Sequence, residues 1–193
     1  RKAIDDVLAK KSYTWDDLVL PLEEADDKLS RLFSPVSHLN SVMNNDELRE
    51  AYEQCLPLIS EYSTFVGQHQ GLYEAYNALH NSDEFKSLTT AQQKSITNAL
   101  RDFKLSGIAL ASEDQKRYGE ISARLSELSS KFGNNVMDAT LAWHKHITDE
   151  ADLSGLPESA LALAADTAKS KELDGWVFTL DFPSYLPIMT YAD

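Results

Sequence analysis

Apolar residues recur every three or four positions along most of the chain, a spacing that predicts a mainly helical protein. The first stripe follows Thr14, which is a good N-cap, and consists of Trp15, Leu18, Leu22, Ala25, Leu29 and Leu32. Pro21 interrupts the stripe, so we expect a break near Leu20. Pro35 predicts that residues 34–42 form a connector or a short helix.

Two further stripes predict the next helices. The first begins after Asn44 or Asn45 and contains Leu48, Tyr52, Cys55, Ile59, Tyr62 and Val66. Pro57 should bend this helix, and the glycines at 67 and 71 mark a weak point before the pattern resumes with Leu72, Ala75, Tyr76 and Leu79. Residues 90–93 (TAQQ) fit a capping box, and they predict another helix with Ile96, Leu100 and Phe103 on its apolar face.

The longest pattern follows a second capping box at residues 112–115 (SEDQ). Its apolar positions are Tyr118, Ile121, Leu125, Leu128, Phe132, Val136, Ala139, Trp143 and Ile147. An unbroken helix from Glu113 to Ile147 would be about 50 Å long at 1.5 Å per residue. Gly133 lies in its middle and costs roughly 1 kcal/mol of helix stability.

The pattern changes near the end of the chain. After Asp149 we expect a short irregular or strand-like stretch, and then an alanine-rich helix from Glu158 to about Leu173. Apolar residues then occupy alternate positions, which predicts a half-buried strand that Pro183 ends; they are Trp176, Phe178, Leu180 and Phe182. Because little upstream sequence looks able to pair with this strand, we expect its partner in a continuation of the chain.

The predicted fold class is therefore all-α in the main: an antiparallel helical bundle with long helices and a short β element near the C-terminal end. We expect residues 1–174 to form the helical amino-terminal domain of a larger protein. Residues 175–193 would then be the strand and the start of the connection into a missing lobe. The first residue, Arg1, also predicts that the natural start was removed or lies upstream.

The amino-acid composition limits the classes of partner that this chain is expected to bind. The 193 residues include 31 acids and 18 bases, a net charge of −13, so nucleic acid and membrane surfaces are not expected partners. No apolar stretch is long enough to span a bilayer, and no signal peptide is visible. The single cysteine, Cys55, cannot form an internal disulfide and is expected to be a buried thiol in the cytoplasm.

The sequence contains no complete catalytic or metal-binding site. His144 and His146 are two residues apart and would diverge on a helix, and His69, beside Gln68, is expected to be structural. The acidic pairs at 16–17, 23–24 and 26–27 are expected on a solvated surface, and the regularly spaced aromatic residues in the core. We therefore predict no catalytic and no metal-binding residues in this chain, while residues that bind substrate are left unknown.

Twelve stretches of the chain form a recognisable pattern: 14–18 (TWDDL), 21–22, 26–29, 34–42 (SPVSHLNSV), 47–53, 56–62, 98–103, 105–107, 124–128, 135–140, 153–159 and 179–191 (TLDFPSYLPIMTY). Together they resemble the amino-terminal region of the thimet-type zinc metallopeptidases, and within that family the bacterial oligopeptidase A group. The resemblance extends over nearly the whole chain, in order and without large gaps, and no single stretch is a catalytic signature.

This resemblance implies a cytoplasmic enzyme that cuts short peptides, including signal-peptide remnants, and a helical, two-lobed fold with a deep channel. It also implies one zinc ion held by an H-E-x-x-H helix and a later glutamate, all of them in the missing catalytic lobe. This chain would then form one wall of the channel and be inactive by itself. The alternative is a self-sufficient helical interaction or scaffold module with no enzyme attached.

Overall fold

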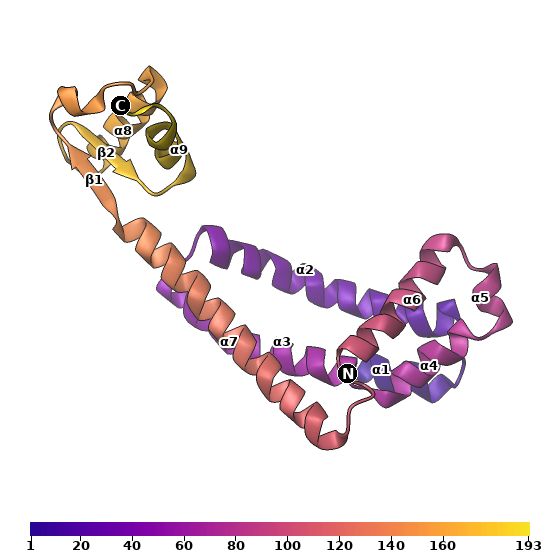
Figure 1. Cartoon of the computed structure of the whole chain (residues 1–193). Coiled ribbons are helices and arrows are strands. Elements are labelled where there is room, and N and C mark those ends of the chain that lie inside the picture. Colours follow the sequence, from indigo (N-terminus) through magenta and orange to yellow (C-terminus); the bar gives the residue numbers. More distant parts are fainter. The chain divides into compact units, whose positions relative to one another are not determined.

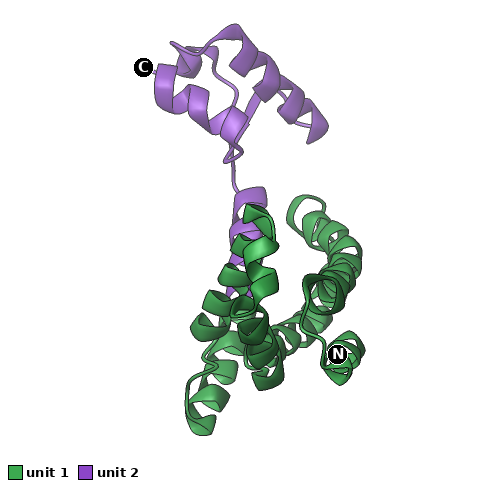
Figure 2. Ribbon diagram, turned by 90° about the vertical axis from the view of Figure 1, so that its right-hand side faces the viewer, with its two compact units in different colours: residues 1–128 green, residues 129–193 purple.

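The computed structural model describes all 193 residues, which divide into two compact units, residues 1–128 and residues 129–193 (Figure 2). Nine α-helices and one two-stranded sheet make up most of the chain (Figure 1), which confirms the predicted fold class. The α-helices and strands are α1 (Lys2–Lys10), α2 (Leu20–Val42), α3 (Asp46–Gly67), α4 (Gln70–His80), α5 (Asp83–Ser87), α6 (Thr90–Leu105), α7 (Ser112–Ala142), β1 (His144–Ile147), α8 (Glu158–Ser170), β2 (Trp176–Thr179) and α9 (Phe182–Tyr191).

Helix starts follow the predicted caps closely. The Thr14 side chain accepts a hydrogen bond from the Asp17 N–H at 3.1 Å, and this cap opens a short π-helical segment, Trp15–Val19. Asn45 caps α3 by accepting from the Leu48 N–H at 2.8 Å. Both caps confirm the sequence prediction, and each satisfies a backbone N–H that the helix leaves without a partner.

The capping box of α6 lies one residue earlier than predicted. Thr89, not Thr90, is the N-cap: its hydroxyl accepts from the Gln92 N–H, and its own N–H donates to the Gln92 side chain at 3.0 Å. The predicted partner, Gln93, donates instead to the carbonyl oxygens of Phe85 and Leu88. Both glutamines can form a box, and contacts with the preceding turn decide between them.

The proline predictions are partly wrong. The break near Leu20 is confirmed, because the π-helical segment ends at Val19 and α2 begins with Pro21 in its first turn. However, α2 runs without interruption through Pro35, where a connector or a short helix was predicted. One proline removes a single backbone donor, and the carbonyl left over belongs to the exposed Arg31, where water can reach it.

The core of the first unit lies where α1, α4 and α6 pack together. Helix α1 was not predicted, since only two buried residues, Ile4 and Val7, mark its inner face. The stripe along α4 and the stripe along α6 are confirmed as core positions. The buried apolar residues of this unit are Ile4, Val7, Leu18, Val19, Leu72, Ala75, Tyr76, Leu79, Ile96, Phe103 and Ile108.

Helix α7 differs from its prediction in two respects. It ends at Ala142 rather than at Ile147, because residues 144–147 form strand β1. Its apolar stripe is also largely exposed: the Phe132 side chain, for example, has 71% of its surface accessible. Periodic spacing therefore predicted the helix correctly, while the covering of its apolar face was predicted wrongly.

The second unit is built around the antiparallel pair β1–β2, in which His144 faces Thr179 and Ile147 faces Trp176. The partner of the terminal strand thus lies upstream in the same chain, and the expectation of a partner beyond residue 193 is wrong. A short 3-10 helix (Glu150–Leu153) and α8 complete the unit, with Leu153, Ala164 and Phe178 in its core.

Gly175 makes the return into β2 possible. Its φ of +81° is accessible to glycine at little cost, and a Cβ atom there would lie 2.5 Å from the carbonyl oxygen of Ile147. Helix α8 approaches the sheet through three buried alanines, Ala160, Ala164 and Ala168, whose small side chains allow close packing.

After β2 the chain forms α9, a helix that was not predicted. Its apolar side chains remain largely exposed, among them Phe182, Tyr185 and Met189. None of the helices combines the length and the apolar character that crossing a membrane requires. The predicted division after residue 174 refers to the organisation of a larger protein and stays a prediction, whereas the compact units of this chain divide after residue 128.

Candidate functional site

The histidines singled out in the sequence have structural contacts. His69 is the N-cap of α4: its Nδ1 accepts from the Leu72 N–H at 3.2 Å, and its ring lies edge-on to Phe65. His144 and His146 lie on strand β1, not on a helix, so side chains two residues apart share one face and the predicted divergence is wrong. The Nε2 atom of His146 donates to the backbone oxygen of Asp174 at 2.5 Å.

Cys55 is a free, half-buried thiol on α3, and not the fully buried thiol that the sequence led us to expect. Asp17 fits the predicted solvated surface: hydrogen bonds from Ser12 and Lys10 lower the pKa of its carboxyl group. The aromatic residues differ among themselves. Phe103 is buried as predicted, whereas Phe132 is exposed, so the expectation that this whole set forms core is wrong.

The chain brings together no group of three or more His, Cys, Asp or Glu side chains that could hold a metal ion. The sequence also contains no H-E-x-x-H. The residues present therefore do not fit the zinc ion that the family resemblance implies, and no catalytic step is assigned to them. That this chain takes no part in metal binding or catalysis in the larger protein stays a prediction.

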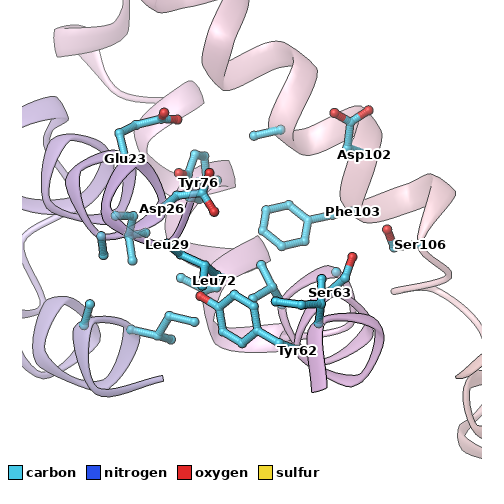
Figure 3. Close-up of a pocket in the computed structure, with 18 residues that line it drawn as sticks. Glu23, Asp26, Leu29, Tyr62, Ser63, Leu72, Tyr76, Asp102, Phe103 and Ser106 are labelled. Atoms are coloured by element: carbon cyan, nitrogen blue, oxygen red, sulfur yellow. The ribbon is translucent and has the colours of Figure 1, made fainter. Parts of the chain in front are cut away.

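Among the cavities of the first unit, one combines apolar and acidic lining residues. It has a volume of about 500 Å³ and is lined by residues of α1, α2, α3, α4 and α6 (Figure 3). This volume lies within the range of about 300–1,000 Å³ typical of small-molecule sites. Its apolar lining includes Ile4, Leu72 and Phe103, which also belong to the core of this unit.

All the charged side chains that line the cavity are acidic. Figure 3 shows Glu23 and Asp26 beside Tyr76, with Asp102 on the other side. No lysine, arginine or histidine lines it. The acids at 23 and 26 are three residues apart, so they share one face of α2, and the sequence could have revealed this pair. Both side chains are exposed, which agrees with the predicted solvated surface, and they also border the cavity.

Tyr76 is the most buried polar residue of this cavity. Only 7% of its surface is accessible, and its ring packs edge-on against Phe103 with the ring centroids 5.7 Å apart. Burial, together with the nearby carboxylate of Glu23, raises the pKa of the Tyr76 hydroxyl above its ordinary value. This hydroxyl is therefore neutral at physiological pH and can either donate or accept a hydrogen bond.

Comparison with known proteins identifies a family that shares this amino-terminal sequence. Residues 1–116 match the family of the neurolysin/thimet oligopeptidase N-terminal domain. The chain belongs to the neurolysin/thimet oligopeptidase family. The match extends from α1 into the start of α7 and includes every element that lines the cavity.

Individual members of the family match the whole chain. Oligopeptidase A of Escherichia coli K12 is 61% identical over 194 residues, and oligopeptidase A of Haemophilus influenzae is 61% identical over 193 residues. Each alignment covers 100% of this chain and 28% of the relative. Dipeptidyl carboxypeptidase of E. coli K12 is 25% identical over 167 residues, or 86% of this chain and 24% of that protein. These identities confirm the resemblance to the oligopeptidase A group, and the chain spans little more than a quarter of the length of these relatives.

Proposed function

We propose that this chain is the amino-terminal helical domain of a zinc-dependent oligopeptidase that hydrolyses short peptides, including signal-peptide fragments. The 61% identity to oligopeptidase A along the entire chain carries this proposal. Insertions or a change of fold would interrupt such an alignment, and it continues through both compact units. We also propose that the enzyme works in the cytoplasm, where a lone thiol such as Cys55 stays reduced.

In this proposal the catalytic groups lie in the part of the enzyme that these 193 residues do not include. A zinc peptidase needs at least three protein ligands around the metal and a carboxylate that assists the attacking water. The chain has neither the H-E-x-x-H pattern nor a gathered set of donors. We therefore expect the isolated chain to be inactive and to hold no zinc stoichiometrically.

The contribution of the chain would be steric. Long, rigid helices such as α2, α3 and α7 are suited to form one wall of a channel, which admits a thin, extended peptide and excludes a folded domain. The exposed apolar side chains of α9, including Phe182 and Met189, would contact the catalytic lobe. Covering them would contribute to stability through burial of apolar surface.

The test compares this chain with the full-length enzyme on a quenched fluorescent decapeptide. Full-length enzyme should cleave the peptide, lose activity to a chelator and regain it with zinc, whereas the 193-residue chain should do none of these. Hydrolysis by the purified chain, or one tightly held zinc per chain in metal analysis, would contradict the division of labour proposed here. A full-length enzyme with this domain removed should begin to degrade a small folded protein, and continued refusal would refute the steric role.

A further inference from the structure

The cavity in the first unit combines features that a purely structural void does not need. A void within a core is normally lined by apolar atoms and stays dry. This one has an apolar floor, three carboxylates and a nearly buried hydroxyl, all within the same lining (Figure 3). Such a mixture of an apolar surface and a few polar groups is typical of a ligand-binding site.

The carboxylates are poorly compensated within the chain. Asp102 has a neighbouring cation, since Arg101 Nη2 lies 2.8 Å from its carboxylate. Glu23 and Asp26 are exposed, and neither forms an ion pair with a basic side chain. Two carboxylates three residues apart on one helix face repel each other, so a cation placed between them would relieve that repulsion.

The Tyr76 hydroxyl supplies the second, independent observation. Its side chain is more than nine-tenths buried, it lines the cavity, and its hydroxyl makes no hydrogen bond within the chain. The hydroxyl oxygen is not among the fully buried atoms that lack a partner, so it is open to the cavity, and a donor entering the cavity can bond to it. An ammonium or guanidinium group has only donors to offer and suits both this oxygen and the adjacent carboxylates.

The floor of the cavity limits the ligand further. The side chains of Leu72 and Phe103 form an apolar surface that a small, fully hydrated cation would leave unused. An anionic ligand would face three carboxylates and no base. We propose that this cavity binds a peptide segment that presents a bulky apolar side chain next to a positive charge, from a lysine, an arginine or a free amino terminus. Binding to this cavity does not depend on the peptidase activity proposed above.

The test is isothermal titration of the full chain with the tripeptide acetyl-Lys-Phe-Leu-amide. This peptide should bind, with an affinity that falls as salt is added, because partly exposed charges are screened. The charge-reversed peptide acetyl-Glu-Phe-Leu-amide should bind at least about tenfold more weakly. Equal binding of the two peptides, or no binding of the lysine peptide at millimolar concentration, would overturn the proposal, and neither comparison needs a variant.

Variants then locate the site. The double variant Glu23→Gln/Asp26→Asn should weaken binding about tenfold, by loss of two cavity carboxylates. Its matched control, Glu24→Gln/Asp27→Asn, removes the same charge from the same helix outside the cavity and should change affinity less than about twofold. An equal loss in both variants would show that net charge alone attracts the peptide and would refute the site.

Discussion

Phe178 should be the most sensitive single position in the second unit. Its side chain is only 2% exposed and lies between the sheet and α8, together with Leu153 and Ala164. A buried aromatic side chain removes roughly 150–250 Å² from water, and Phe→Ala substitutions in cores cost about 3–5 kcal/mol. A unit of this size is stabilised by less than about 10 kcal/mol, so Phe178→Ala should remove a large part of its stability.

The chain offers a matched control four residues later. Phe182 has the same side chain at the start of α9, but 69% of its surface is accessible. With about a third of the ring covered, Phe182→Ala should cost about 1 kcal/mol. Both variants should be studied by urea unfolding in a Trp15→Phe background. The remaining tryptophans, Trp143 and Trp176, then report on the second unit.

The unfolding free energies of the two phenylalanine variants should differ by about 3 kcal/mol. Hydrogen exchange of β2 and α8 amides should show the same order, because global opening limits exchange in a core strand. If Phe182→Ala destabilised the unit as much as Phe178→Ala, burial would not be the cause. In that case the assignment of Phe178 to the core would be wrong.

Three further predictions concern the first unit. Gly67→Ala places a Cβ atom 2.5 Å from the Cβ of Ser106 and should lower the free energy of unfolding by urea by about 1–3 kcal/mol. Adding Ser106→Gly removes that contact and should restore most of the lost stability. If the loss persisted in the double variant, the clash would not be its cause. Asn45→Ala removes the cap of α3 and should lower stability by about 1 kcal/mol, while Asn45→Asp should keep it. The raised pKa of Tyr76 favours the neutral hydroxyl in the folded state, so its stabilising contribution is complete below the unfolded pKa of about 10 and is lost as the pH rises beyond it. Melting temperatures from pH 8 to 11 should fall less steeply in Tyr76→Phe, and an unchanged slope would contradict the assignment.

Local sequence determined most of the helices. The side chains of Thr14 and Asn45 cap the helices that follow them, as their chemistry predicts, because a capping bond needs only residues three positions apart. The apolar stripes of α4 and α6 identified core positions such as Leu79 and Ile96 for the same reason: spacing along a helix fixes which residues share a face. The resemblance to the thimet-type peptidases also came directly from the residues, because it depends on their order and not on their packing.

The candidate site could be predicted only in part. The pairing of Glu23 with Asp26 on one face of α2 follows from their spacing, and so does the inward position of Tyr76 on α4. Their meeting with Phe103 does not, since that requires α2, α4 and α6 to pack around one cavity. The volume and the one-sided charge of that cavity are properties of the packing.

Tertiary contacts determined the secondary structure of the C-terminal part of the chain. Residues 144–147 continue a helical pattern and yet form β1, because pairing with residues 176–179 satisfies backbone groups that local spacing does not describe. The same pairing placed the partner of β2 upstream and left α9 free to form a helix of its own. Periodicity specifies which side chains lie on one face, but only contacts between residues distant in sequence decide whether that face is covered.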